Sequence, residues 1–289
     1  MKKSCLFVLP MAVGLFGCNQ QASAPKPNPA DSATTSHTAP TSNPDNDLPA
    51  DAPVVQVAMT GTDEPFTFKD ERGSLMGLEY DIIQAVGQSQ GFKVEPIIIS
   101  PNNLLSGLDT KNYDLVIATM GHTDERASKY GVSKSYFSTP SAIMHIKPDL
   151  NINSYKDLAG MNVAVGSGSY HEKDLNEIGT IKSLDALNST YLMFQGMVQG
   201  KYDAIVQDQT MLQYTANKYP DIKVVLSPYY PNLADNRDDV VMIMHKDNTE
   251  LLEKVNQGID EIKANGKLDE ISQKWLGTST QDNVKDGVK

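Results

Sequence analysis

The fold is decided by the stretch Asp114-Leu115-Val116-Ile117-Ala118-Thr119-Met120-Gly121-His122-Thr123-Asp124-Glu125-Arg126. Its first five residues are mostly apolar and partly β-branched, which predicts a buried strand. Small and polar residues then lead to an acidic pair and an arginine, which is typical of a strand that runs into a helix. Units of this kind build α/β folds.

The same alternation of strands and helices continues in both directions along the chain. Apolar residues fall on one helical face at Leu78, Ile82, Ile83 and Val86, and again at Leu251, Leu252, Val255, Ile259 and Ile262. Gly91 and Gly266 stand where these two helices are expected to end. The further predicted strands are Val54-Val57, Val94-Ile99, Asn162-Val165, Asp203-Val206, Lys223-Leu226 and Val240-Met244. We therefore expect an α/β body in which mostly parallel sheets are covered by helices.

Composition excludes several classes of protein. The chain has 289 residues and a formal net charge of -11, which argues against a nucleic-acid partner because a phosphate-binding surface needs clustered Lys and Arg. The two cysteines, Cys5 and Cys18, both precede the body, which leaves the body without a disulfide, a cysteine nucleophile or a thiolate metal site. The histidines are scattered and show no i, i+4 pair. We expect no metal and no other cofactor.

The first residues are typical of an exported protein. Lys2 and Lys3 precede an apolar stretch, residues 6–16, that is too short to span a bilayer and has the length of a signal-peptide core. Leu15-Phe16-Gly17-Cys18 resembles the lipobox of bacterial lipoproteins, in which the cysteine receives fatty acids such as palmitate, although Phe16 is atypical there. We expect residues 1–18 to be a lipoprotein signal peptide, with an incidental Cys18 after a plain signal peptide as the alternative.

Residues 19–53 predict a tether between that lipid and the body. The segment is rich in Pro, Ser, Thr and Ala and has no aromatic residue. Such a composition cannot bury enough apolar surface to offset the entropy of ordering, so we expect an extended, flexible linker.

Three strand-to-helix junctions carry groups that complement a zwitterion. In open α/β sheets, ligands bind beyond the carboxyl ends of the strands, where loops lead into helix N-termini. The first junction contributes Arg126, the second is the run Gly166-Ser167-Gly168-Ser169-Tyr170, and the third contains Asp208. An arginine and helix N-termini suit a carboxylate, and an aspartate suits an ammonium group. These junctions predict a zwitterion, with a carboxylate and an ammonium group, as the ligand.

Further motifs stand in order along residues 54–277. They are Pro65-Phe66, Gly77-Leu78-Glu79-Tyr80-Asp81-Ile82, Leu104-Leu105-Ser106-Gly107-Leu108, Thr123-Asp124-Glu125-Arg126, Asp157-Leu158-Ala159-Gly160, Gly200-Lys201-Tyr202-Asp203-Ala204 and Lys274-Trp275-Leu276-Gly277. Together they resemble the polar amino-acid solute-binding proteins of ABC transporters. The resemblance implies a two-lobed periplasmic binding protein type II fold with two crossover hinge strands.

In that family's arrangement, residues 54–139 plus 239–277 would form lobe 1, residues 140–238 would form lobe 2, and residues 278–289 are a polar tail. The resemblance implies a monomeric binding protein, not an enzyme, that captures an amino acid between its lobes and delivers it to a transporter permease. It would act outside the cytoplasm, in the periplasm or at the cell surface, and touch the membrane only through its N-terminal lipid.

The family's ligand-binding residues have counterparts in this chain. The resemblance implies that Arg126 and the backbone N–H groups of Thr119 and Ser169 bind the ligand's carboxylate. It also implies that Asp208 binds the α-ammonium group.

Four other positions belong to the same expected site. A main-chain carbonyl near Ala118 or Gly121 is expected to assist the aspartate. Tyr170 and Phe66 lie in the matching motifs and are expected to contact the ligand.

The half of the site that would face the ligand's side chain departs from the family's pattern. An aromatic residue is common at the position of Asp63, and a large apolar residue at the position of Pro101. Asp63 and Glu79 are expected to face a cationic or hydroxylated side chain, although Glu79 also fits an exposed first-turn helix position that the helix dipole favours. The amino acid itself is not identified by these residues.

Other interpretations stay open at this point. Asp208 could cap the following helix, and Ser169 and Thr119 are also common capping residues. A periplasmic lyase of the cyclohexadienyl dehydratase type could use the same fold, with Glu172 or Glu64 as its acid, but Asp208 argues against it because prephenate has no amino group. A sensor or adhesin-like antigen is a third possibility. The glycine-serine run is neither a P-loop nor a nucleophile elbow.

Overall fold

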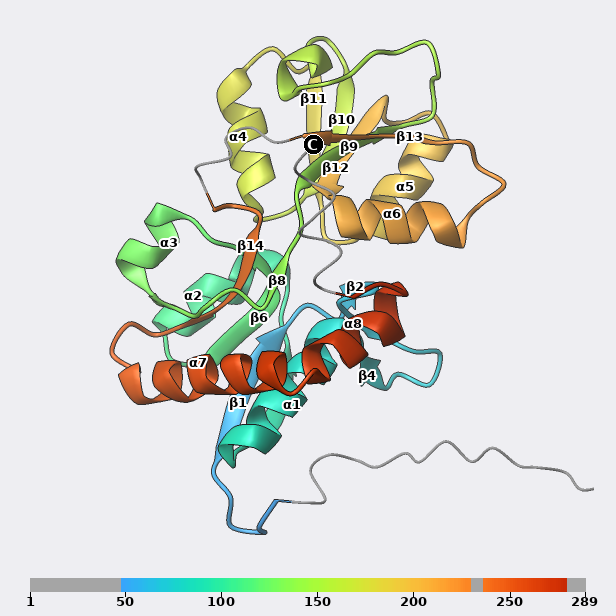
Figure 1. Ribbon diagram of the computed structural model, residues 1–289. Coiled ribbons are helices and arrows are strands. Elements are labelled where there is room, and N and C mark those ends of the chain that lie inside the picture. The colour runs from blue at the N-terminus through green and yellow to red at the C-terminus, as the bar shows by residue number, and fades with distance from the viewer. Residues whose placement is uncertain (1–47, 230–235, 280–289) are drawn as a thin grey trace, which may run out of the picture. The chain divides into compact units, whose positions relative to one another are not determined.

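The computed structural model describes residues 48–229 and 236–279, and all of them belong to one compact unit, Ser42–Lys289. The expected signal peptide, most of the expected tether and nearly all of the expected polar tail lie outside the described residues. The α/β architecture predicted from the sequence is confirmed, and it is built on two main sheets (Figure 1).

The first sheet has the strand order β5-β1-β6-β14-β7, with β8 also paired to β14. Its strands are β1 (Val54–Met59), β5 (Lys93–Ile98), β6 (Leu115–Gly121), β7 (Gly131–Val132), β8 (Phe137–Ser138) and β14 (Asp239–Met244). β1 runs parallel to both β5 and β6, whereas β14 is antiparallel to β6. A small antiparallel sheet, β2 (Thr62–Asp63), β3 (Thr67–Lys69) and β4 (Leu75–Met76), follows β1. We call this part, with its helices, the first lobe.

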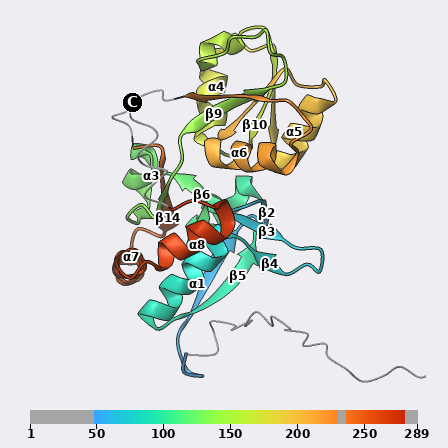
Figure 2. The same ribbon diagram turned by 45° about the vertical axis from the view of Figure 1, so that its right-hand side comes forward.

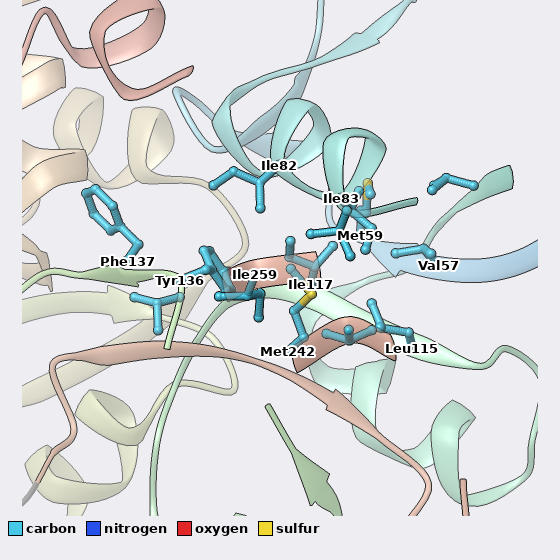
Figure 3. Packing of buried hydrophobic residues seen from close by; sticks show 14 of the residues in the cluster. Val57, Met59, Ile82, Ile83, Leu115, Ile117, Tyr136, Phe137, Met242 and Ile259 are labelled. Atoms are coloured by element: carbon cyan, nitrogen blue, oxygen red, sulfur yellow. The ribbon is translucent and has the colours of Figure 1, made fainter. Parts of the chain in front are cut away.

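Helices cover both faces of the first sheet. On one face lie α1 (Leu78–Gln90), α7 (Thr249–Ala264) and α8 (Lys267–Leu276), which pack against one another (Figure 2). The core under them is formed by side chains such as Met59 of β1, Ile117 of β6, Met242 of β14, Ile83 of α1 and Ile259 of α7 (Figure 3). A smaller core forms with α2 (Leu104–Asp109), which follows the short helical segment η2 (Pro101–Asn103), on the other face. The short α3 (Asp124–Lys129) follows β6.

The second sheet has the strand order β11-β10-β12-β9-β13. Its strands are β9 (Ser141–His145), β10 (Asn162–Gly166), β11 (Ser183–Leu187), β12 (Ala204–Asp208) and β13 (Val225–Tyr229). Two cores cover it, one with α5 (Thr190–Val198) and α6 (Gln209–Lys218), the other with η3 (Tyr155–Leu158) and α4 (Tyr170–Ile178). We call this part the second lobe.

The chain crosses between the two sheets twice, once from β8 to β9 and once from β13 back to β14. The strands that make these crossings run against their neighbours: β9 is antiparallel to β12, and β14 is antiparallel to β6. The two sheets are therefore mixed, and the expectation of mostly parallel sheets holds only for their β5-β1-β6 and β11-β10-β12 parts.

Gly77 sets the start of α1, the helix that carries Glu79. Its φ is 133°, and a Cβ added there would lie 2.1 Å from the carbonyl oxygen of Phe66. Only glycine lets the backbone approach this closely. As a result, the N–H groups of Leu78 and Glu79 bond to the carbonyls of Pro65 and Phe66, which docks the start of the helix on the small sheet.

Candidate functional site

A cavity of about 180 Å³ is lined by residues of both lobes. The strands β6, β10 and β12 end at it, each running directly into the loop or helix that follows, as expected for ligand sites in α/β sheets. The sequence-predicted residues that line it are Asp63, Ala118, Thr119, Gly121, Arg126, Ser169, Tyr170 and Asp208. Residues that the sequence reasoning did not select also line it, among them Thr60, Asn102, His171, Asn188, Ser189 and Met211.

Arg126 reaches the cavity from the first lobe. It is the third residue of α3, whose N-cap Thr123 accepts a hydrogen bond from the Arg126 backbone N–H. The Arg126 Nη1 donates to the carbonyl oxygen of Gly121 at 2.6 Å, which aims the guanidinium at the end of β6. Burial lowers the pKa of Arg126 from its usual value, but a guanidinium remains charged in proteins. The site therefore holds one fixed cation whose remaining N–H donors can take a carboxylate.

The second lobe faces this cation with the N-terminus of α4. Ser169 is the N-cap, and its Oγ accepts from the Glu172 N–H at 3.2 Å and donates to the Gly166 carbonyl at 2.6 Å. The Ser169 hydroxyl thus acts as a cap, one of the two roles that the sequence left open. The aromatic ring of Tyr170 lies so close to the end of β6 that a Cβ at Gly121 would stand 2.9 Å from the ring.

Asp208 supplies a carboxylate at the end of β12. It occupies the N-cap position of α6, but its side chain makes no capping hydrogen bond. Its Oδ1 instead lies 3.4 Å from Nε2 of His171. Asp208 is 7% exposed and lines the cavity, so its second carboxylate oxygen can serve a ligand.

A buried network of polar side chains connects to Asp208 through His171. Nδ1 of His171 lies 2.8 Å from the hydroxyl of Tyr155 and 3.4 Å from Oγ of Ser141, which in turn contacts the Tyr170 hydroxyl at 3.0 Å. Burial raises the pKa of both tyrosines well above the usual value. Because every polar atom of such a network has a partner, its members are held in fixed positions.

The sequence reasoning missed His171, although the sequence contained a signal for it. His171 stands four residues before Leu175 and belongs to the buried face of α4. A histidine on the apolar face of a helix that starts at a ligand-binding loop needs polar partners. Those partners come from η3 and β9, which lie elsewhere in the sequence.

Glu79 does not face the cavity, which corrects the expectation for this residue. It is 0% exposed and lies beneath the site. Its Oε1 accepts from the Thr119 backbone N–H at 2.5 Å and from the Tyr136 hydroxyl, and its Oε2 accepts from Thr67 at 3.1 Å. Burial raises the pKa of Glu79 and the three hydrogen bonds lower it. The effect of burial is larger, so the pKa is raised to about 7.

Phe66 is a second correction. It is 0% exposed and packs edge-to-face on Phe137 in the core of the first lobe, with ring centroids 5.6 Å apart. It is absent from the cavity lining because the turn before β3 directs it beneath α1.

Asp63 lines the cavity, at the end of β2. Its Oδ2 accepts from the hydroxyl of Thr60 at 2.7 Å. Burial raises the pKa of Asp63 to about 6, the Thr60 hydrogen bond lowers it, and the nearby Asp208 charge raises it further. The carboxylate is therefore ionised at neutral pH.

The two glutamates nominated for a lyase lie elsewhere. Glu64 accepts from Tyr214 at 3.1 Å and from Lys218 at 2.6 Å, and Glu172 accepts from the Gly168 N–H at 2.7 Å. Neither lines the cavity. Within residues 48–229 and 236–279, no cluster of three or more potential metal ligands is found, and no helix of those ranges has the length and apolarity to cross a membrane.

Known proteins share this arrangement of lobes and strands. Residues 55–278 match the model of the bacterial extracellular solute-binding proteins, family 3. The chain belongs to this family. It is accordingly an extracytoplasmic solute-binding protein with the two-lobed fold that the sequence predicts.

Individual relatives bind amino acids. The L-cystine-binding protein TcyJ of Escherichia coli (strain K12) is 28% identical over 222 residues, which cover 76% of this chain and 82% of that protein. The solved structure of an ancestral arginine-binding protein bound to glutamine is 30% identical, with a TM-score of 0.70 over 78% of this chain and 98% of that one. These relatives are binding proteins, in agreement with the expectation that this chain is not an enzyme.

A third similarity bears on the lyase alternative. The ancestral amino acid-binding protein AncCDT-1, a precursor of cyclohexadienyl dehydratase, is 27% identical, with a TM-score of 0.67 over 77% of this chain and 95% of that one. That protein is itself an amino acid-binding protein.

Proposed function

We propose that this chain is the binding component of an amino-acid ABC transporter, and that Arg126 and Asp208 hold the two ends of a free α-amino acid. One observation carries the proposal: a guanidinium from the first lobe and a carboxylate from the second line the same cavity. A zwitterion satisfies both charges at once. A ligand without an amino group would leave the buried Asp208 without a cation, which is costly.

Capture works by closure of the lobes. Each lobe binds one part of the ligand, and the ligand stabilises the closed arrangement by its greater affinity for it. Micromolar affinity requires about -8 kcal/mol. Charge-assisted hydrogen bonds of about 1.5–3 kcal/mol each, at Arg126 and at Asp208, supply much of that. The crossings near residues 139 and 239 serve as the hinge between lobe 1, residues 54–139 plus 239–277, and lobe 2, residues 140–238.

The ligand's side chain carries a positive charge. Among the described residues that line the cavity, Arg126 is the sole Lys or Arg, whereas Asp63 and Asp208 both contribute carboxylates. The zwitterion uses Arg126 and Asp208, which leaves Asp63 without a cation. A guanidinium or ammonium group at the end of the ligand's side chain compensates this charge, and one similar solved structure is that of an ancestral arginine-binding protein bound to arginine.

Calorimetric titration with L-arginine, L-glutamine and L-cystine tests the assignment. We expect Arg126→Ala and Asp208→Asn each to weaken binding at least about tenfold, the loss of one charge-assisted hydrogen bond. Lys129→Ala is the matched control, because Lys129 is an exposed cation on the same helix as Arg126. If both site variants fold, as thermal unfolding can show, and bind with unchanged affinity, the assignment of Arg126 and Asp208 to the ligand site is refuted.

The chain is held at a membrane by a lipid on Cys18. The proposal rests on the lipobox-like Leu15-Phe16-Gly17-Cys18 and on the tether composition of residues 19–53. Growth of producing cells with a labelled fatty acid tests it: the wild-type chain takes up label and Cys18→Ser does not. Equal labelling of the two, or no labelling of either, contradicts the anchor and leaves the ligand site unaffected.

A further inference from the structure

Thr119 has a backbone conformation that is unusual for its residue type. It lines the cavity at the end of β6, and its φ is +50°. Left-handed backbone is uncommon for any residue with a Cβ and is a genuine outlier for a β-branched one. Such strain persists only where surrounding groups hold it, and it concentrates at ligand sites.

The backbone N–H of Thr119 is hydrogen-bonded to Glu79. The Glu79 carboxylate accepts this N–H at 2.5 Å, from a helix forty residues earlier in the chain. The carboxylate itself accepts hydrogen bonds from the Tyr136 hydroxyl and from Thr67 Oγ1. All three residues, Glu79 included, are buried in the first lobe. Gly77 fixes the helix start that carries Glu79, because no Cβ fits at that position.

The two polar groups of Thr119 that could bond to a ligand differ in their hydrogen bonding. The N–H group of Thr119 already has a carboxylate acceptor, so this N–H is occupied in the described structure. Its hydroxyl oxygen, in contrast, is buried and has no hydrogen-bond partner among the described residues. Buried hydroxyls in native proteins are nearly always paired, so the unpaired hydroxyl of a residue that lines the cavity is a candidate partner for a ligand bound there.

We propose that Glu79 is a positioning residue of the binding site, which holds Thr119 in its left-handed conformation by taking its N–H, so that the Thr119 hydroxyl, and not its amide, bonds to the ligand. The inference rests on the proposed function, since it needs an amino acid in this cavity. It replaces the expected amide contact of Thr119 with a hydroxyl contact and assigns a role to a carboxylate that no ligand touches.

Substitutions at Glu79 separate positioning from simple core packing. Glu79→Gln keeps an amide oxygen for Thr119 and Tyr136 and offers an N–H to Thr67, whose hydroxyl can accept it. Glu79→Leu fills similar space but leaves the Thr119 N–H without an acceptor. We expect Glu79→Gln to bind L-arginine, L-glutamine or L-cystine within a few-fold of wild type, and Glu79→Leu to bind at least about tenfold more weakly.

Substitutions at Thr119 test the hydroxyl. Thr119→Ser keeps it, whereas Thr119→Val is nearly isosteric and lacks it. We expect Thr119→Ser to retain affinity and Thr119→Val to lose about tenfold. Equal affinity of wild type and Thr119→Val would overturn the hydroxyl contact.

A double-mutant cycle connects the two residues. Glycine adopts left-handed backbone without strain, so in a Thr119→Gly background the backbone no longer needs Glu79. Glu79→Leu should then cost less than about twofold, against about tenfold in the Thr119 background. The same cost in both backgrounds would show that Glu79 acts through general stability and would overturn the positioning role.

A measurement without ligand keeps the inference testable whether or not these three amino acids bind. In ¹H–¹⁵N spectra of the full chain, an amide that donates to a carboxylate at this short distance should resonate far downfield and exchange slowly. We expect this Thr119 signal in wild type and Glu79→Gln and its loss in Glu79→Leu. An ordinary Thr119 amide in wild type would refute the inference, whereas failure of the proposed function would appear as unchanged affinity in Arg126→Ala and Asp208→Asn.

Discussion

Asp63 is the residue whose ionisation should govern the choice of ligand. Its pKa is raised to about 6 by burial, so its carboxylate is charged above that pH and gains a proton below it. A cationic side chain binds the charged form. We therefore expect the affinity for L-arginine to fall as the pH is lowered from 7.5 through 6 to 5, approaching about tenfold per pH unit below the pKa. Calorimetric titration across this range measures it.

Asp63→Asn provides the control for that dependence. The variant keeps an oxygen that can accept from Thr60 and has no carboxyl to titrate. We expect it to bind L-arginine at least about tenfold more weakly at pH 7.5 and to lose most of the change between pH 7.5 and 5. A pH profile that is the same with and without Asp63 would assign the dependence to another group and argue against a cationic ligand.

Single residues show why part of the site could be predicted from the sequence. Arg126 stands shortly after the end of β6 and Asp208 is the last residue of β12, at junctions whose sequence pattern is local, so their places in the cavity lining could be predicted. The true position of Glu79 depends on Tyr136, which is fifty-seven residues away. Yet Glu79 stands three and four residues before Ile82 and Ile83, on the apolar face of α1. Helical spacing alone places it on the buried side, whereas its charge led us to expect that it faces the ligand or, alternatively, solvent.

At the scale of elements, the predicted strands that were found each contain at least two β-branched residues, Val or Ile, in a short run. The predicted strands at β1, β5, β6, β10, β12, β13 and β14 all exist. β11, which contains Asp185 and is only half-buried at the sheet edge, has no such run. β9 is a short segment with Ser141 and His145 at its ends, and its burial comes from neighbours on both sides. Pairing with distant strands, and not local sequence, defines these two elements.

Ser169, the N-cap of α4, lies in the cavity lining, so its effects on stability and on ligand binding have to be measured separately. Ser169 caps the helix through its hydroxyl, so Ser169→Ala should lower the free energy of unfolding by about 0.5–2 kcal/mol. Because the hydroxyl is engaged by the helix and by Gly166, we expect ligand affinity to change less than about threefold, well below one charge-assisted hydrogen bond. Denaturant unfolding and calorimetric titration of the same variant measure both quantities.

The reverse pattern would reassign Ser169. A large loss of affinity with unchanged stability would show that the hydroxyl leaves its cap to contact the ligand. Ser169→Asp, which retains capping ability but adds a negative charge near the expected carboxylate, should keep the stability and weaken binding.

At the scale of the whole molecule, the polar contacts between the lobes involve mostly exposed side chains among the described residues. Thr62 Oγ1 donates to the Asn188 carbonyl at 2.9 Å, Ser167 Oγ contacts Asn102 at 2.8 Å, Lys173 pairs with Glu125 at 2.9 Å, and Glu64 accepts from Tyr214 and Lys218 of α6. The side chains of Lys173 and Glu125 are 62% and 56% exposed, and such pairs contribute about 0–1 kcal/mol. We expect contacts of this kind to let the lobes separate when the cavity is empty.

The ligand should therefore decide whether the lobes close. Fluorescence energy transfer can follow this between Ser128→Cys on α3 and Asn176→Cys on α4, both exposed positions, in a full chain that also carries Cys5→Ser and Cys18→Ser. We expect the two dyes to move closer as the amino acid saturates the cavity, because only the liganded site links Arg126 to Asp208. A control pair within the first lobe, Ser128→Cys with the exposed Glu250→Cys, should show no change.

The same labelled chain with Arg126→Ala distinguishes bridging from a nonspecific effect of the amino acid. Without the guanidinium, the ligand loses one of its contacts to the first lobe, and its differential affinity for the closed arrangement is reduced. We expect a smaller closed population at equal occupancy, and not merely weaker binding. If calorimetry shows saturation of the wild-type chain while the transfer efficiency stays constant, then the lobes do not close on the ligand, and capture by a hinge motion is wrong for this protein.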